Sequence, residues 1–290
     1  MPRRKFFAAA FVILCLLFAL CRAGVAESRS PRIRVVTTCY PLYIMALNVF
    51  EGVAGVSLEN LTPPAAGCLH GYSLTAGERK RLEEASVVVA NGAGLEPFLG
   101  EIIGGPSGNN VVQLAADIPL RENNPHVWVN PAYAIRQVRN LDRYMEEYDP
   151  GHAAQYRHNT EVYCASLGAL RQRMHEGLDH YRGRAIITNH NAFPYFAEEF
   201  GLTVAGVIER EPGGVPEAAE SADIVRMIKG HGLRALFSEP QYPAFAIDVI
   251  AQETGNKVFV LDPAVTGPDH PDAYITIMDR NLAALKDALQ

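Results

Sequence analysis

The sequence predicts an α/β protein of two lobes, each with a mainly parallel four-stranded sheet, joined by a long backbone helix. Two observations predict this fold. Short strands that are apolar throughout alternate with helical segments in both halves of the chain, a pattern typical of parallel sheets covered on both faces. A helical stretch of about thirty residues, long enough to reach ~45 Å, separates the two halves.

Each half contains four predicted strands. In the first half, apolar and β-branched runs indicate strands at 33–38, 56–61, 86–90 and 110–114, with helices at 42–50, 77–85 and 95–103. In the second half, the same criteria place strands at 184–188, 203–208, 235–238 and 257–261. The helices of that half are expected at 193–200, 216–230, 243–254 and 274–289.

The segment between the halves is helical by its periodicity. Pro131 begins one helix, which ends near Pro150, and a second helix extends from about 152 to 181. Apolar and aromatic residues recur along the second helix at spacings of three, four or seven, which places them on one face. They are Tyr156, Tyr163, Leu167, Leu170, Met174 and Leu178. We therefore expect a signal peptide (1–26), an N-terminal lobe (27–150), a linker helix (151–181) and a C-terminal lobe (182–290).

The N-terminus has the features of an export signal. Three basic residues at 3–5 precede an uncharged apolar run at 6–20, which is short for a membrane span. Gly24-Val25-Ala26 fits the rule for signal peptidase, which predicts cleavage after Ala26 and a periplasmic or other extracytoplasmic protein. A lipid anchor at Cys21 is the alternative, although Leu20 stands where a small residue is expected.

Composition excludes some partners. The first 26 residues carry four basic and no acidic side chains, so their removal changes the formal net charge from −6 to −10. An acidic protein does not favour nucleic acid or an anionic membrane surface. Three cysteines remain after cleavage, Cys39, Cys68 and Cys164, and an odd number excludes a disulfide scaffold.

Three histidines and one aspartate indicate a metal site. His70, His126 and His190 lie in separate loops, and Asp262 follows the strand at 257–261. In open α/β sheets, ligands bind at the carboxyl ends of strands, so these residues would place an ion in the cleft between the lobes. Three imidazoles and a carboxylate suit Zn²⁺, or Mn²⁺ and Fe²⁺ as alternatives, and a closed four-coordinate shell suits carriage rather than catalysis.

Each of these residues also has a structural interpretation. A lone histidine is more often a hydrogen-bonded loop residue than a ligand, and Asp262 precedes a proline as turn residues do. Glu239, at the end of the strand at 235–238, is a rival fourth ligand, or else orients a histidine that binds the ion.

Several motifs resemble a known family along nearly the whole mature chain. They are, in order, VVTTCYPLY, NLTPP, VVVANGAGLEPFL, NPHVWVNP, NHNAFPYFAEEFGL, EPQYP and VFVLDP. The chain resembles the solute-binding subunits of zinc/manganese ABC transporters, the cluster A-I metal-binding proteins. The resemblance implies two βα lobes joined by a rigid helix, one metal between the lobes, and His70, His126, His190 and Asp262 as its ligands.

The same resemblance implies the partners. Such a protein is expected to be a monomer that passes its ion to the membrane permease of an ABC transporter and opens by modest lobe and loop shifts. The chain departs from the family where 101–124 lacks the histidine-rich loop of many zinc-specific members. It also has Cys-Leu-His-Gly-Tyr-Ser at 68–73, without the acidic neighbour that usually follows the first histidine.

The sequence leaves open the roles of two cysteines. Cys39 and Cys68 could form a disulfide, Cys68 could donate a thiolate to the metal, or both could be unrelated small residues.

A zinc hydrolase would need a general base beside an open metal position, and Glu239 is the one candidate for that base, without a recognisable motif. A surface adhesin on the same scaffold would leave the ligand set unexplained.

Overall fold

The structure is a computed structural model that describes residues 33–63, 66–100, 110–208, 218–233 and 235–290. Residues Ile33–Gln290 form one compact unit. The predicted signal peptide, its cleavage site after Ala26 and the alternative anchor at Cys21 lie outside the described residues.

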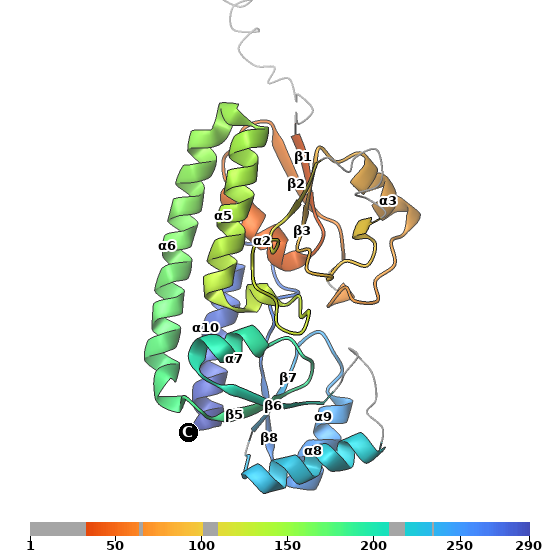
Figure 1. Ribbon diagram of the computed structural model, residues 1–290, viewed down its shortest axis with the longest axis vertical. Helices are drawn as coiled ribbons and strands as arrows, with labels where there is room; N and C mark the ends of the chain where they lie inside the picture. The colour runs from red at the N-terminus through yellow and green to blue at the C-terminus, as the bar shows by residue number, and fades with distance from the viewer. Residues whose placement is uncertain (1–32, 64–65, 101–109, 209–217, 234) are drawn as a thin grey trace, which may run out of the picture. The chain divides into compact units, whose positions relative to one another are not determined.

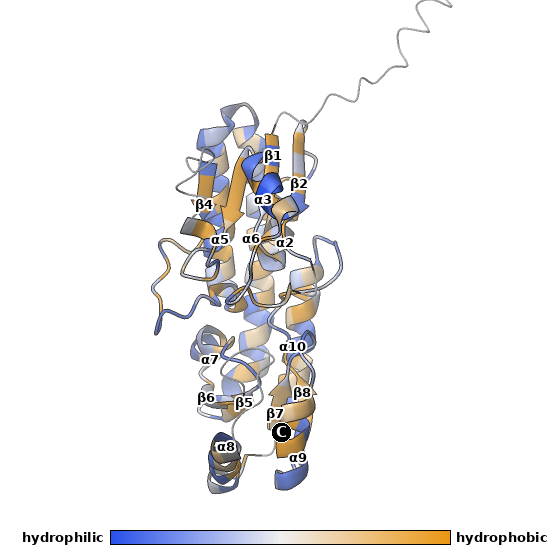
Figure 2. Ribbon diagram, turned by 90° about the vertical axis from the view of Figure 1, so that its right-hand side faces the viewer, coloured by the Kyte–Doolittle hydropathy of each residue, from blue (hydrophilic) through white to orange (hydrophobic). Residues whose placement is uncertain are grey.

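The first sheet contains the four strands predicted for the first half. They are β1 (Ile33–Thr37), β2 (Val56–Asn60), β3 (Val87–Ala90) and β4 (Val111–Gln113), in the order β2-β1-β3-β4 and all parallel. Helix α2 (Tyr40–Val49) connects β1 to β2, and helix α3 (Ala76–Glu83) connects β2 to β3. Helix α3 is strongly hydrophilic (Figure 2) and begins with a capping box between Thr75 and Glu78, so its start depends on local hydrogen bonds more than on burial.

The prediction of a helix at 95–103 is wrong for its first turn. Residues 95–98 lie in a turn region, and helix begins only at Leu99, beyond which residues 101–109 lie outside the described part of the chain. The cause is Glu96, whose buried carboxylate accepts hydrogen bonds from Thr38 Oγ1 and the backbone N–H groups of Asn91 and Gly92. These bonds fold the segment back on the strand end, which overrides its helical pattern.

The second sheet repeats the strand order of the first. It contains β5 (Ala185–Thr188), β6 (Thr203–Val207), β7 (Ala235–Ser238) and β8 (Lys257–Val260), in the order β6-β5-β7-β8 and again parallel. Its helices are α7 (Pro194–Phe200), α8 (Ala218–His231), α9 (Phe245–Thr254) and α10 (Ala273–Leu289). Both α7 and α9 end at a left-handed glycine, Gly201 and Gly255, as helix C-termini often do.

Two antiparallel helices connect the halves. Helix α5 (Pro131–Tyr148) and the 26-residue helix α6 (Ala153–Leu178) run side by side along the first lobe, and α6 continues along the second (Figure 1). The predicted end of α6 at 181 corresponds to a final 3₁₀ turn, Asp179–Tyr181. All six residues predicted to form the inner face of α6 are buried, which confirms the interpretation of its periodicity.

The hydrophobic core continues from one half into the other. A single cluster of buried side chains includes Leu42 of α2, Leu167 of α6, Phe196 of α7 and Met278 of α10. A second cluster lies between the other face of the second sheet and helices α8 and α9. Because α10 packs against both α6 and α2, the C-terminal helix belongs to the core of both lobes. Within the described residues, no helix is both long and apolar enough to cross a membrane.

Two buried hydrogen bonds connect the halves at Trp128, which lies in the 3₁₀ helix Val127–Val129. Trp128 Nε1 donates to the carbonyl oxygen of Pro263 over 2.8 Å, and Tyr274 Oη of α10 donates to the carbonyl oxygen of Trp128 over 2.7 Å. Trp128 and Tyr274 are each 1% exposed. A buried carbonyl that loses its donor is costly, so these bonds fix the spacing between the halves.

Replacing Tyr274 with phenylalanine tests this contribution. We expect Tyr274→Phe to lower the free energy of unfolding by about 1–2 kcal/mol, because the buried Trp128 carbonyl is left without its donor. Tyr148→Phe is the matched control, since Tyr148 is 38% exposed and its hydroxyl bonds to Ser86 at the surface; its effect should stay within about 0.5 kcal/mol. Equal effects of the two variants in urea unfolding would contradict the assignment.

Candidate metal centre

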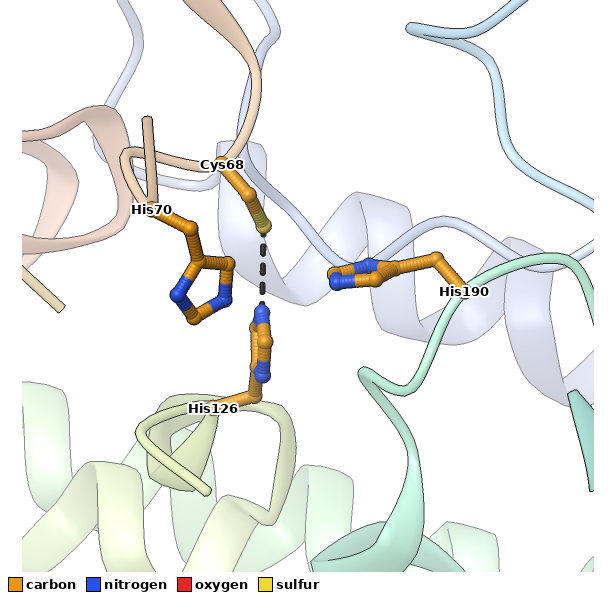
Figure 3. Close-up of side chains that lie close together, drawn as sticks. All are labelled: Cys68, His70, His126 and His190. Carbon is orange, nitrogen blue, oxygen red and sulfur yellow. Dashed lines mark hydrogen bonds between the residues drawn. The ribbon is translucent and has the colours of Figure 1, made fainter. Parts of the chain in front are cut away.

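Four side chains of types that bind metals converge where loops of the two lobes meet. One donor atom each from Cys68, His70, His126 and His190 lies within 4.8 Å of all the others. The three imidazoles surround a common point toward which the Cys68 sulfur is directed (Figure 3). Ring centroids are 4.7 Å apart for His126 and His190, 5.2 Å for His70 and His126, and 6.0 Å for His70 and His190.

Each of these side chains follows the carboxyl end of a strand. Cys68 and His70 lie in the loop between β2 and α3, His126 lies between β4 and the 3₁₀ helix, and His190 comes two residues after β5. Since parallel strands end at the same edge of their sheet, the topology brings these loops together. The structure therefore gathers the three predicted histidines, drawn from both halves of the chain.

Asn124 fixes the orientation of His126. Its side-chain oxygen Oδ1 accepts from the backbone N–H of His126 over 2.9 Å and lies 2.8 Å from His126 Nδ1. Since an amide oxygen only accepts, Nδ1 carries the ring proton and Nε2 keeps its lone pair. The Nδ2 of Asn124 donates to the backbone oxygen of Asn191 across the lobes. This neutral tautomer directs Nε2 toward the other donors, as metal binding requires.

His190 lies beside a buried carboxylate. Its Nδ1 is 3.7 Å from Oε2 of Glu239, and both side chains are almost fully buried. Among the residues that the structure describes, neither His190 Nδ1 nor Glu239 Oε1 has a hydrogen-bond partner, whereas Gln241 donates to Glu239 Oε2. Buried polar atoms are rarely left unmatched. A shift of a few tenths of an ångström would form the carboxylate–histidine pair that supports many metal-bound imidazoles.

Cys68 is held from the opposite lobe. Its backbone N–H donates to Oη of Tyr242 over 3.1 Å, and its Sγ lies 3.1 Å from His126 Nε2. The preceding Gly67 has φ +60°, and a Cβ there would lie 2.9 Å from the Tyr242 hydroxyl. A glycine is therefore required for the close approach that brings Cys68 to the histidines.

Burial keeps two of the four side chains, His126 and Cys68, uncharged in the absence of a metal. Desolvation, with smaller effects of His190 and His70, holds the pKa of His126 well below its ordinary value of 6.5. Desolvation and the charge of Glu239 raise the pKa of the Cys68 thiol, partly offset by a hydrogen bond from Tyr242. Both groups are consequently neutral near pH 7, and the imidazole is already in the form that binds a cation.

Asp262 lies outside this group of four. Its Oδ1 accepts from the backbone N–H of Ala264 over 2.8 Å, and its own backbone N–H and carbonyl group pair with the side chain of Asn281. Desolvation raises the pKa of Asp262 from 3.8 to about 6; the Glu239 charge adds to this rise and the Ala264 N–H opposes it. Its assignment as a ligand stays a prediction.

The cysteines described in the structure, Cys39, Cys68 and Cys164, are all free thiols. Cys39 is buried and close enough to Cys68 for the two to influence each other electrostatically. Of the roles weighed for Cys68, the structure places it beside the histidines. Its backbone partner Tyr242 lies 174 positions away in sequence, a pairing that residue patterns could not have indicated.

Comparisons with known proteins find relatives that are named for metal binding or zinc uptake. A family model described as ZnuA, the periplasmic component A of a zinc-uptake complex, matches residues 35–288. A protein of Thermotoga maritima, provisionally named a metal-binding protein, is 30% identical over 261 residues, which cover 88% of this chain and 92% of that protein.

Two further proteins are similar over their whole length. The high-affinity zinc uptake system protein ZnuA of Bacillus subtilis is 26% identical over 307 residues, covering 97% of this chain and 95% of that one. The structure of the solute-binding protein FpvC of Pseudomonas aeruginosa in complex with Mn²⁺ has a TM-score of 0.79 and 28% identity, covering 89% of this chain and 99% of that chain. The two-lobe α/β fold is therefore shared with proteins that bind metals.

The raised pKa of Asp262 predicts a dependence of stability on pH in metal-free protein. Its folded-state pKa of about 6 exceeds the ordinary value of 3.8, so its contribution to stability is complete below about pH 4 and is lost as pH rises through 6. Asp262→Asn keeps an oxygen for the Ala264 N–H and removes the titration. We expect the stability of wild type relative to this variant to fall by up to about 2 kcal/mol between pH 4 and 7. Urea unfolding in chelator measures it, and a difference that does not change with pH would contradict the prediction.

Proposed function

The chain belongs to the ZnuA family of periplasmic zinc-uptake components, and on that premise we propose that it is an extracytoplasmic receptor for a transition-metal ion. Zinc is the proposed ion, and its delivery to the permease of an ABC transporter is the proposed role. The observation that carries the proposal is the convergence of His70, His126 and His190 from loops of both lobes.

The donor atoms support zinc first. Imidazole nitrogen suits zinc, whereas manganese prefers sites richer in oxygen ligands. The relatives named for zinc uptake favour the same ion, while the manganese complex of FpvC supports manganese as the alternative. Iron is a further alternative on donor chemistry alone. As the fourth ligand, the sequence proposed Asp262, with Glu239 as its rival.

Binding and release follow from neutral donors. Because burial lowers the pKa of His126, an arriving ion does not compete with a proton at Nε2 near neutral pH. Acidification restores that competition, so affinity should fall as the imidazoles become protonated. The partly exposed His70 lies at the solvent side of the two buried histidines, which gives the ion a first contact on entry.

The remaining features of the proposal concern the whole protein. We propose cleavage after Ala26 and a soluble monomer whose lobes are 27–150 and 182–290, joined through 151–181. The mass of the exported protein distinguishes this chain, which would begin at Glu27, from one acylated at Cys21. Catalysis is not proposed, because Glu239, the one candidate base, is bound by Gln241 and faces a histidine rather than an open metal position.

Removing single histidines tests the site. We expect His126→Ala and His190→Ala each to weaken zinc binding by at least about a hundredfold, because each deletes a ligand from a four-coordinate shell, while circular dichroism stays unchanged. His180→Ala is the matched control, since His180 is exposed at the end of α6. Competition against a zinc-binding dye measures the affinities. Unchanged affinity in both site variants would overturn the assignment of the site.

A further inference from the structure

We propose that Sγ of Cys68 is the fourth ligand of the ion, so that the centre is a three-histidine, one-cysteine site. This inference rests on the proposed function, and it assigns the position that the sequence gave to Asp262. It also narrows the cargo to divalent ions that favour sulfur.

The spacing of the donors supports this assignment. In a tetrahedral zinc site with Zn–S of about 2.3 Å and Zn–N of about 2.0 Å, sulfur and nitrogen lie about 3.5 Å apart. Cys68 Sγ and His126 Nε2 are 3.1 Å apart. Without the ion, the thiol donates a hydrogen bond to the imidazole, and an increase of a few tenths of an ångström in this distance would admit zinc in place of the thiol proton.

The donor atoms of the other two ligands lie nearby. All four donor atoms lie within 4.8 Å of one another, so the shell closes around an ion through movements of about 1 Å, within the range of side-chain rotation. Figure 3 shows Cys68 directed into the space that the three imidazoles surround. Sulfur completes a donor set drawn from three separate loops.

The backbone around Cys68 is anchored independently of any metal. The Tyr242 hydroxyl accepts a hydrogen bond from the Cys68 N–H, and the left-handed conformation of Gly67 allows that close contact. Tyr242 follows β7 in the opposite lobe. The thiol is therefore positioned in advance by an interlobe contact, which lowers the cost of ordering a ligand when the ion binds.

Asp262 already has a structural role. Its carboxylate oxygen Oδ1 accepts the N–H of Ala264, a residue with φ +58°, so it stabilises a left-handed turn after β8. Asn281 of α10 fixes the backbone of Asp262 on both sides. A carboxyl group that holds this turn is not among the four converging donors.

A sulfur ligand changes the selectivity of the site. Thiolate favours zinc, cobalt and other ions with affinity for sulfur, whereas manganese prefers oxygen. One thiolate supplies the same single negative charge as a carboxylate. Replacing a carboxylate ligand with sulfur therefore changes the preference among metal ions more than it changes the total charge of the site. The site is then expected to discriminate against manganese even though the chain lacks a histidine-rich loop.

Cobalt titration of the reduced mature protein, performed without oxygen, tests the assignment. Co²⁺ bound to thiolate has an intense near-ultraviolet charge-transfer band, which nitrogen and oxygen ligands do not produce. We expect the band in wild type, in Asp262→Asn and in the matched cysteine control Cys164→Ser, and its loss in Cys68→Ser. We also expect Cys68→Ser to lower the preference for zinc over manganese by about tenfold or more.

The outcomes separate this assignment from the proposed function. A wild-type protein that binds cobalt without the band, or a Cys68→Ser variant that keeps it, would overturn the sulfur ligand and leave the receptor intact. A wild-type protein that takes up neither cobalt nor zinc would overturn both. If Cys68→Ser fails to fold, X-ray absorption of zinc-loaded wild type decides: one sulfur at about 2.3 Å supports the assignment, and a shell of nitrogen and oxygen alone overturns it.

Discussion

The position of His126 relative to the second lobe depends on one set of buried hydrogen bonds around Tyr195. Its hydroxyl donates to the carbonyl oxygen of Asn124 over 2.7 Å and accepts from the backbone N–H of Arg121 over 2.9 Å. Asn130 Nδ2 donates to the backbone oxygen of Tyr195. Because such groups are costly to leave unpaired once buried, the segment 121–130 is tied to α7. A metal site that uses His126 and His190 together requires this connection.

The same connection limits how the protein opens. The continuous core formed by α2, α6, α7 and α10 would have to be broken for the lobes to separate widely. Two donors, His126 and His190, lie on segments tied to each other through Asn124 and Asn191. The other two, Cys68 and His70, share one loop. That loop is itself anchored, by the buried Leu69 and by the hydrogen bond from the Cys68 N–H to Tyr242, so only modest shifts are expected, as the family resemblance implies.

Periodicity and apolar runs were enough to predict the eight strands, their parallel arrangement and α6, because these features follow from local sequence. They failed at 95–98, where the hydrogen bonds of Glu96 overrode the helical pattern. The convergence of the three histidines could be predicted from their positions after strands. The fourth ligand could not be decided in this way, because the direction of Asp262 depends on the left-handed Ala264 and that of Cys68 on the distant Tyr242.

Metal content tests the claim that this chain carries one transition-metal ion between its lobes. The mature protein would be purified without added metal, analysed for elements, stripped with chelator and offered equal zinc and manganese. We expect one zinc per chain, regained in preference to manganese. Preferred uptake of manganese would contradict the donor chemistry assigned to the site, and a protein that neither holds nor regains any metal would contradict the claim itself.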